Sequence, residues 1–337
     1  MRVGIYFDMR NPPGWAVDWN RLYGFTLEMC EEAERLGCPS IWFSEHHLFD
    51  DGYLPEPLTF AAAVAARTRT ARIGTAIVIA PLHHPVTLAE QVAIVDIVSG
   101  GRVDLGIGAG YRVPEFDLFG ADLSKRYGTT DNCARELRRL WEVVTPRPVQ
   151  QSVPIWMGYQ GPKGARRAGL LGEGLLSSTA SLWPEYRAGL EEAGHDPSIA
   201  RMAGGMNGWV TEDPEDDWPL VAKHVAAQLD SYRRHMVEGT DQPVPRPIDP
   251  DKLRNRKSQG RPLDSITYGT PEEVAASLKE QTAGAPVEEV FLWASVAGMP
   301  EEQVAKGVHA ICSTLAPLLA DYDPMASNAS AHRPCAN

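Results

Sequence analysis

The sequence predicts an α/β fold, a parallel (β/α)8 TIM barrel with a lid insertion before its last strand. Eight apolar, strand-like runs recur along the 337 residues, amphipathic helical patterns alternate with them, and no second compositional domain interrupts the alternation. Because parallel strands need helical crossovers, eight β-then-α units match this barrel. A doubly wound sheet is the competing architecture, but no GxGxxG motif follows the first run. We therefore expect a single barrel domain over residues 1–320.

Two periodicities define the expected strands and helices. The strand-like runs are RVGIYFD at Arg2, SIWFSEH at Ser40, RIGTAIVIA at Arg72, RVDLGIGAG at Arg102, PIWMGY at Pro154, GLLSS at Gly174, GGMNGWV at Gly204 and EEVFLWA at Glu288. Between them, apolar residues recur at helical spacing, so that each helix has a stripe to bury against the sheet. These stripes comprise Leu88, Val92 and Val95; Leu137, Leu140, Trp141 and Val144; Trp218, Val221, Val225, Leu229 and Tyr232; and Val304, Val308, Ile311 and Leu315.

Two segments fall outside this alternation. Residues 239–264 are rich in proline and charge and show no periodicity, which in a compact enzyme favours a lid over a linker. Residues 321–337 end in SNASAHRPCAN and are expected to form a disordered C-terminal tail.

Composition argues against several classes of partner. The net charge of −12 would repel nucleic acid and anionic membranes, and no basic block offers a binding stripe. Neither a signal peptide nor an uninterrupted run of about 18 apolar residues is present. The five cysteines are scattered and never form CxxC, so neither a disulfide framework nor a zinc knuckle is indicated. We expect a cytoplasmic protein with no nucleic-acid or membrane partner.

The stretch WFSEHHLFDD, from Trp42 to Asp51, sets a carboxylate and two imidazoles behind the second predicted strand. Active sites of such barrels lie at the carboxyl ends of the strands, so Glu45, His46 and His47 would lie at the mouth. Alternation does not decide which imidazole points inward, because it often fails at a strand's last residue. The structural alternative is that one histidine caps the strand while the other is solvated.

A second pair, His83 and His84, follows the third predicted strand and could approach the first pair. A shared metal site is disfavoured, because adjacent histidines cannot easily both face one ion and no HxH or HExxH motif is present. Pro81 and Pro85 bracket the pair, which favours a rigid turn with one packed histidine. We therefore predict no metal site.

The fourth predicted strand loses its side chains on one face towards its end. Asp104, Gly106, Gly108 and Gly110 alternate onto the same face, which becomes nearly bare at the barrel mouth. Glycines at these positions favour room for a flat ligand, although tight packing within the barrel would use them equally well.

The fifth predicted strand runs into GYQGPKGARRAG, where glycines precede a helix that begins near Pro162. Free backbone amides at the start of such a helix, with Lys163 and Arg166 nearby, would seat a phosphate. The structural alternative is a glycine-rich turn with a solvated basic face.

Taken together, these motifs resemble the bacterial luciferase family of flavin-dependent monooxygenases, whose members are (β/α)8 barrels. The resemblance covers most of the chain in order, although residues from about 178 to 267 match only in their pattern. The motifs on which the resemblance rests are WFSEHH at Trp42, GTAIVIAPLHHPVTLAEQVAIVDIVSGGRVDLGIGAGY from Gly74 to Tyr111, FDLFGAD at Phe116, PIWMGYQGPKGARRAG at Pro154, and YGTPEEV followed by EEVFLWA.

The resemblance implies a set of site residues. The first imidazole of the EHH motif, here His46, would be the catalytic histidine, with Glu45 close by. A non-prolyl cis peptide bond, here between Ala76 and Ile77, would lie beneath the flavin ring. The other implied cofactor-binding residues are Gly108, Ala109 and Tyr111 after the fourth strand, and Gly158, Tyr159, Gln160, Gly161 and Gly164 after the fifth.

Two positions depart from luciferase itself, which has a reactive cysteine where this chain has Gly108 and a phosphate-contacting arginine where it has Ala109. Light emission is therefore not implied. Phosphate binding would depend on the backbone amides of residues 161–164, assisted by Lys163 or Arg166.

The resemblance also implies a reaction. A separate flavin reductase would supply reduced FMN, which would react with O2 to form a flavin peroxide that oxygenates a small organic substrate. The lid would keep water from the site. His46 would move a proton to or from the peroxide or the substrate, with Glu45 tuning its pKa. Family members commonly pair through helices beside strands two and three, so we expect a homodimer.

Three other functions are compatible with a barrel of this kind. A deazaflavin-dependent reductase or dehydrogenase would transfer hydride without oxygen, but relatives that use this coenzyme more often have a lone DH where this chain has EHH. A flavin-binding barrel without catalytic activity is argued against by the intact EHH motif and glycine set. A metal hydrolase is the remaining alternative.

Overall fold

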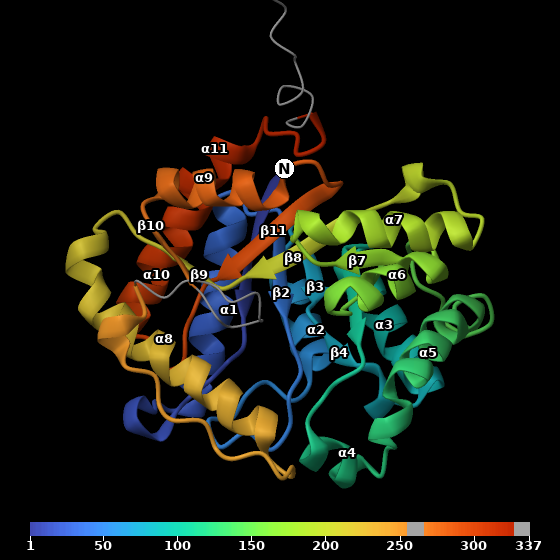
Figure 1. The fold of residues 1–337 in the computed structure, drawn as a ribbon, viewed down its shortest axis with the longest axis horizontal. Helices are drawn as coiled ribbons and strands as arrows, with labels where there is room; N and C mark the ends of the chain where they lie inside the picture. Colours follow the sequence, from blue (N-terminus) through green and yellow to red (C-terminus); the bar gives the residue numbers. More distant parts are fainter. Residues whose placement is uncertain (255–265, 327–337) are drawn as a thin grey trace, which may run out of the picture.

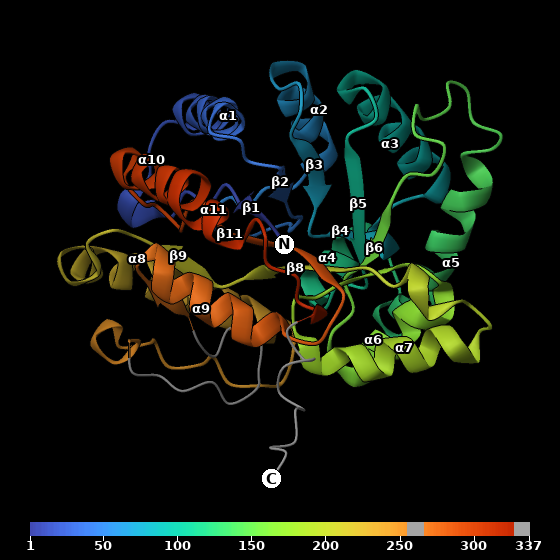
Figure 2. The ribbon, with the colours of Figure 1, turned by 90° about the horizontal axis from the view of Figure 1, so that it is seen from above.

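The computed structural model describes residues 1–254 and 266–326 and shows a closed parallel barrel ringed by helices (Figure 1 and Figure 2). The predicted fold is therefore confirmed. The barrel strands, in chain order, are β1 (Arg2–Phe7), β2 (Ser40–Phe43), β3 (Arg72–Thr75), β4 (Val78–Ile79), β5 (Val103–Gly108), β6 (Ile155–Met157), β7 (Gly174–Leu176), β8 (Met202–Met206) and β11 (Val287–Trp293).

The third predicted strand is divided into β3 and β4. Ala76 and Ile77 separate the two halves and are joined by a cis peptide bond, which is the position expected for it. Both halves pair with β5, and the pairing of β3 with β5 closes the barrel. The nine strands therefore occupy eight positions around the barrel.

The seventh predicted strand, GGMNGWV, is also divided. Its first half belongs to β8, whereas β9 (Gly208–Val210) leaves the barrel and pairs with β10 (Thr267–Gly269) in a separate two-stranded sheet. The prediction of one continuous barrel strand is wrong here, because periodicity alone does not show where a strand changes sheets.

Helices follow most barrel strands and surround the sheet (Figure 2). Most residues of their predicted apolar stripes are buried, as Leu88, Val92 and Val95 illustrate, whereas Trp218 and Tyr232 are partly exposed. The helices are α1 (Trp19–Arg35), α2 (Pro57–Arg67), α3 (Pro85–Ser99), α4 (Val113–Phe119), α5 (Arg126–Leu140), α6 (Gly161–Leu171), α7 (Trp183–Glu192), α8 (Pro214–Val237), α9 (Pro271–Thr282), α10 (Glu301–His309) and α11 (Ala316–Leu319). A π-helical turn (Ala310–Leu315) joins the last two, and short 3-10 helices span Pro13–Trp15, Ala80–Leu82, Leu123–Lys125, Ala180–Leu182, Pro197–Ile199 and Pro250–Lys252.

The predicted lid segment lies between α8 and β10. Its first part stays close to α8, because the Ile248 amide donates to both carboxylate oxygens of Asp230 at 3.0 and 2.9 Å. Residues 255–264 of the segment lie outside the described residues.

The disordered tail predicted over residues 321–337 includes six residues, 321–326, that the structure describes. The Tyr322 hydroxyl donates to the Lys279 carbonyl at 2.8 Å, and the Gly284 amide donates to the Pro324 carbonyl at 2.8 Å. The prediction of disorder is therefore wrong for residues 321–326, which hydrogen bonds with α9 and the turn after it hold in place. Residues 327–337 lie outside the described part of the chain.

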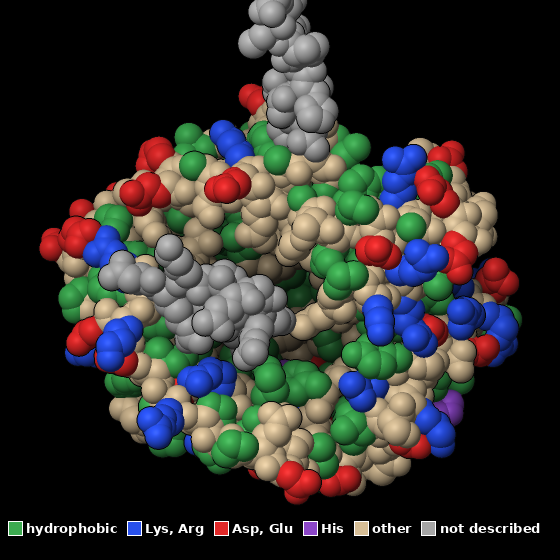
Figure 3. Space-filling view, in the orientation of Figure 1, with side chains coloured by type: hydrophobic (Ala, Val, Ile, Leu, Met, Phe, Trp, Pro, Cys, Tyr) green, Lys and Arg blue, Asp and Glu red, His purple; other side chains and the backbone are tan. Residues whose placement is uncertain are grey.

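The molecular surface carries charges of both signs, interspersed over the face seen in Figure 3, with a hollow near its centre. Within residues 1–254 and 266–326, no helix combines the length and apolar character that crossing a membrane requires.

Candidate active site

The EHH motif lies just past the carboxyl end of β2, at the barrel mouth, as predicted. All three side chains are buried, and His46 is 8% exposed. They contact residues that follow β4 and β5, and His46 also contacts α8. The interpretation of one capping and one solvated histidine is therefore excluded.

His46 is oriented by Glu115, from the first turn of α4. The Nδ1 atom of His46 lies 2.8 Å from Glu115 Oε1, which also accepts a hydrogen bond from the His47 amide at 2.9 Å. Because a carboxylate only accepts hydrogen bonds, the proton of a neutral His46 lies on Nδ1. Its Nε2 atom is then free to accept a proton, and the nearest hydroxyl, that of Tyr111, lies 3.4 Å away.

Four aromatic rings surround the imidazole of His46. Their centroids lie at 4.7 Å for Phe49, 4.8 Å for Tyr53, 5.4 Å for Tyr111 and 6.2 Å for Tyr232. Tyr111 and Tyr232 are partly exposed, so they border the space that His46 faces. Burial raises the pKa of the Tyr111 hydroxyl well above its ordinary value of 10.0, so this group stays a neutral hydrogen-bonding partner.

Glu45 does not contact the His46 ring. Its Oε1 lies 2.7 Å from Nε2 of His47 and 2.9 Å from Nε2 of His83, and its Oε2 accepts from the Ile79 amide at 2.7 Å. The prediction that Glu45 acts on His46 is therefore wrong, because its carboxylate points towards β4 and the ring of His46 pairs with Glu115 instead. The backbone amide of Glu45 also donates to the Ile77 carbonyl at 3.1 Å, so Glu45 binds the main chain of the break at Ile77 and that of β4 at Ile79.

Glu45 and His83 each stabilise the charged form of the other. Burial raises the pKa of Glu45, but hydrogen bonds from His47 and His83 outweigh it and lower that pKa from 4.5. For His83, burial lowers the pKa, but the hydrogen bond and charge of Glu45 outweigh it and raise that pKa above 6.5.

His84 is exposed and accepts from the Val86 amide at 3.3 Å, so one histidine of this pair is packed, as predicted. Among the described residues, no three His, Cys, Asp or Glu side chains are arranged to hold a metal ion.

The glycines of β5 do not leave an open space. A Cβ atom on Gly108 would lie 2.8 Å from Cγ1 of Ile77, and one on Gly158 would lie 2.4 Å from its Cγ2. A Cβ on Gly106 would meet the Thr75 carbonyl oxygen at 1.9 Å. The prediction of room for a flat ligand is thus wrong for these positions: the glycines accommodate Ile77 and the backbone of β3.

The loop after β6 leads into α6 as expected. This helix begins at Gly161, which has φ of +70°, and Pro162 follows in the first turn. Within the described residues no side chain caps its start, and Gln160 and Lys163 are exposed there. Arg166 forms an ion pair with Glu192, so of the two predicted phosphate-binding cations only Lys163 lacks an ion pair among the described residues.

Tyr159 and Gly164 have structural contacts in this loop. The Tyr159 hydroxyl donates to Oδ1 of Asp131 at 2.5 Å, and Arg167 pairs with the same carboxylate at 2.6 Å. A Cβ atom on Gly164 would lie 2.8 Å from Cβ of Tyr159, so this glycine allows the helix to pack on the tyrosine. The hydroxyl of Tyr159 is therefore directed towards α5.

The remaining predicted residues lie near the mouth. Ala109 is buried directly after β5, and Tyr111 stands beside His46. Glu115 was missed by sequence reasoning, although an acidic residue in the first turn of the helix after the glycine-rich strand was a usable signal. Arg112, also missed, is buried and donates to the carbonyl of His47, and its Nη2 lies 2.5 Å from Oε2 of Glu238.

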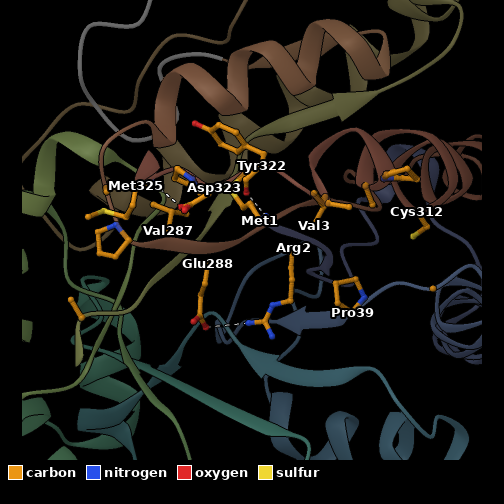
Figure 4. A pocket seen from close by; sticks show the side chains of 18 of the residues that line it. Met1, Arg2, Val3, Pro39, Val287, Glu288, Cys312, Tyr322, Asp323 and Met325 are labelled. Carbon is orange, nitrogen blue, oxygen red and sulfur yellow. Dashed lines mark hydrogen bonds and ion pairs between the residues drawn. The ribbon is translucent and has the colours of Figure 1, made fainter. Parts of the chain in front are cut away.

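A cavity of about 1000 Å³ lies at the opposite end of the barrel (Figure 4). Met1, Arg2, Glu288, Cys312 and Tyr322 are among the residues that line it, and Arg2 and Glu288 form an ion pair at 3.1 Å. Because the strands begin there, this cavity is remote from the EHH motif, and barrels of this kind place their chemistry at the other end.

The sequence model for luciferase-like monooxygenases matches residues 1–289. The chain belongs to this family. The family assignment agrees with the closed barrel, with the EHH motif at its mouth and with the cis bond between Ala76 and Ile77.

Two relatives of known name differ in the cofactor that their names give. The oxygenase component of a flavin-dependent trigonelline monooxygenase from Acinetobacter baylyi is 31% identical over 180 residues, which cover 48% of this chain and 50% of the relative. An F420-dependent glucose-6-phosphate dehydrogenase from Amycolatopsis mediterranei is 29% identical over 198 residues, 50% of this chain and 59% of the relative. The chain thus spans between half and three-fifths of these relatives.

A solved luciferase-like barrel shows the same fold. It is the oxygenating constituent of 3,6-diketocamphane monooxygenase from Pseudomonas putida, in complex with FMN. Its TM-score is 0.69 at 18% identity, with 94% of this chain and 98% of that chain covered.

The residues at the mouth fit a flavin mononucleotide. The uncapped amides at Gly161 and Lys163 suit a phosphate, and partly exposed Tyr111 and Tyr232 offer ring faces beside His46. The hollow seen in Figure 3 is in keeping with space for a ligand.

Proposed function

We propose that this chain is a flavin-dependent monooxygenase that uses reduced FMN and O2 to oxygenate a small organic substrate, with a separate flavin reductase as partner. The observation that carries the proposal is the pair of His46 and Glu115 at the barrel mouth. With its Nδ1 proton directed to Glu115, His46 has Nε2 available to take up and return a proton.

In this proposal bound FMN supplies the reaction with O2, and the protein supplies orientation and proton transfer. The amides of residues 161–164 and Lys163 hold the phosphate, and Ile77, Ala109, Gly108, Gly158 and Gln160 border the ring and its chain. His46 moves the proton at Nε2, and Tyr111 fixes the hydrogen-bonding geometry there. The segment of residues 239–254 acts as part of a lid that limits water at the mouth.

The second candidate is a deazaflavin-dependent dehydrogenase. It is favoured by one observation, the similarity to an F420-dependent relative over 198 residues. A hydride transfer to deazaflavin would use the same His46 as an acid or base but would need no oxygen. A non-catalytic flavin-binding barrel would need neither His46 nor Glu115 in this arrangement.

One experiment separates these functions. The purified protein is titrated anaerobically with reduced FMN and, in parallel, with reduced and oxidised deazaflavin, and each complex is then mixed with oxygen and a substrate panel. Tight binding of reduced FMN with substrate-dependent oxygen uptake supports the proposal. Binding of deazaflavin alone, with substrate-dependent reduction, would establish the second candidate, and FMN binding without turnover of any substrate would favour the non-catalytic barrel.

We further propose a homodimer that forms through α3. An exposed apolar stripe runs along the outer face of this helix, with the polar Thr87 and Glu90 exposed beside it, and the neighbouring α2 carries small residues. Stripes of this kind on a globular protein commonly mark an interface. The stripe comprises Val86, Ile94, Ile97 and Val98, and the neighbouring small residues are Ala62, Ala63 and Ala66.

We propose a cytoplasmic location. Within the described residues the four cysteines are unpaired and buried, which suits a reducing compartment.

A further inference from the structure

A buried charge cluster follows β1 and lies behind the aromatic rings that surround His46. Arg10 is enclosed completely, with Nε 3.1 Å from Oδ2 of Asp8 and Nη1 donating to Oδ2 of Asp51 at 2.8 Å. Ser231 of α8 donates to the same Asp51 oxygen at 2.9 Å. The cluster therefore joins the end of β1, the loop after β2 and helix α8.

Three aromatic rings lie between Arg10 and His46. The Arg10 guanidinium carbon lies 4.1 Å from the ring centroid of Tyr232, 4.7 Å from that of Tyr53 and 5.3 Å from that of Phe49. The same three rings contact the imidazole of His46 at 6.2, 4.8 and 4.7 Å. Each ring thus packs against the arginine and against the histidine, so a shift of the guanidinium would be transmitted to the imidazole.

The backbone makes a second connection between the cluster and His46. The Leu54 amide donates to the Asp8 carbonyl at 3.1 Å, and the Leu54 carbonyl accepts from the His46 amide at 3.2 Å. The Asn11 amide donates to the Asp51 carbonyl at 2.7 Å. The end of β1 therefore supports the main chain of His46 as well as its ring.

The cluster is a costly way to stabilise a barrel. Met9, between Asp8 and Arg10, has φ of +62° although it is not glycine, a conformation that is unfavourable for a residue with a side chain. Two carboxylates are buried with one guanidinium, and Arg10 Nη2, both Asp8 oxygens and Asp51 Oδ1 lack a hydrogen-bond partner within the described residues. Well-packed apolar residues would stabilise the fold at this position as well or better. The charged cluster is therefore expected to serve a purpose other than the stability of the fold.

We propose that Arg10 is a positioning residue for His46, acting through Phe49, Tyr53 and Tyr232. Asp8 and Asp51 hold the guanidinium against the three rings, and the rings hold the imidazole in the orientation in which Nδ1 meets Glu115. The inference rests on the proposed function for its catalytic meaning, but the positioning itself is a property of the protein without cofactor.

The test uses Arg10→Met and a matched control, Arg102→Met. Arg102 is also a buried arginine with several hydrogen bonds, including one to the Ala71 carbonyl at 2.6 Å, but it lies at the amino end of β5. Cofactor-free proteins with 15N-labelled histidine are compared by NMR, with the His46 ring signals assigned from His46→Gln. In Arg10→Met we expect the Nδ1 proton of His46 to exchange with solvent faster by on the order of tenfold, while Arg102→Met leaves it unchanged.

A folded Arg10→Met protein whose His46 signals and exchange match the wild type would overturn the inference. If Arg10→Met does not fold, Arg10→Lys is measured instead, since it keeps the charge but not the planar contact with the rings. His46 signals and exchange that match the wild type in Arg10→Lys would also overturn the inference. In the FMN-loaded protein we expect product formation to fall about 10²-fold in Arg10→Met, with FMN affinity unchanged within about threefold. Lack of turnover in the wild type would count against the proposed function alone, because the NMR result is obtained without cofactor.

Discussion

Glu115 accepts hydrogen bonds from two adjacent residues, the Nδ1 of His46 at 2.8 Å and the amide of His47 at 2.9 Å. One carboxylate oxygen therefore fixes the ring of His46, which is proposed to move the proton, and the main chain of the residue that follows it. We expect Glu115→Gln to lower the turnover number by about 10- to 100-fold, because a neutral amide orients the imidazole less strongly. Steady-state rates with FMN and substrate measure this. Glu185→Gln, which removes an exposed carboxylate on α7, is the control and should retain full activity.

His46→Ala tests the proton-transfer role directly. We expect FMN affinity to stay within about threefold of the wild type, whereas product formation falls by about 10² to 10⁴, the usual contribution of general acid–base catalysis. Hydrogen peroxide release should account for the oxygen consumed. His309→Ala, an exposed histidine on α10, serves as control. Undiminished product formation in His46→Ala would remove His46 from the mechanism.

The pair of Glu45 and His83 should make stability depend on pH. The raised pKa of His83 stabilises the fold fully below pH 6.5 and loses this effect as the pH rises through the folded-state pKa. The lowered pKa of Glu45 stabilises the fold above pH 4.5 and loses this effect as the pH falls. The free-energy difference of unfolding between the wild type and His83→Gln should therefore be largest between pH 4.5 and 6.5, about 2 kcal/mol, and shrink towards pH 9.

Urea unfolding at several pH values gives this free-energy difference, with His84→Gln as the matched neighbour because its side chain is exposed. A difference for His83→Gln that is constant from pH 5 to pH 9 would show that the pair is not ionised as described.

The contact between Gly158 and Ile77 predicts a compensating pair of substitutions. Gly158→Ala would place a Cβ atom 2.4 Å from Cγ2 of Ile77 and should destabilise the fold by about 1–3 kcal/mol. Ile77→Ala removes the clashing atom, so the double variant should be more stable than the sum of the single effects. A double-mutant cycle in denaturant measures the coupling, and additive effects would mean that the two side chains do not meet.

The proposed homodimer depends on the exposed face of α3. Ile94→Glu should convert the dimer to a monomer in sedimentation experiments, because a charge would be buried at the interface. Ile199→Glu is a matched control, since Ile94 and Ile199 are each 47% exposed but lie on different parts of the surface. A wild-type protein that sediments as a monomer would refute the proposal outright.

The sequence predicts the barrel because each strand and helix shows its own periodicity, and it predicts the position of His46 because strand ends meet at one mouth. It does not predict the partner of His46. Glu45 is next to His46 in the chain, yet its carboxylate turns to β4, and Glu115, 69 residues away, takes its place. Contacts of this kind depend on side-chain direction, which neither spacing nor composition contains. The interpretation of the β5 glycines failed for the same reason, since Ile77 fills the space that they leave.

Tyr232 and Ser231 of α8 complete a cluster whose other members precede residue 55 in the sequence; Ser231 and Asp51 are 180 positions apart. Contacts of such long sequence separation require the chain between them to close into a loop first. The surroundings of His46 are therefore incomplete until α8 docks. A form of the protein with α8 undocked would contain the whole EHH motif and still lack Tyr232 beside the imidazole, so the ring signals of His46 would report the docking of α8.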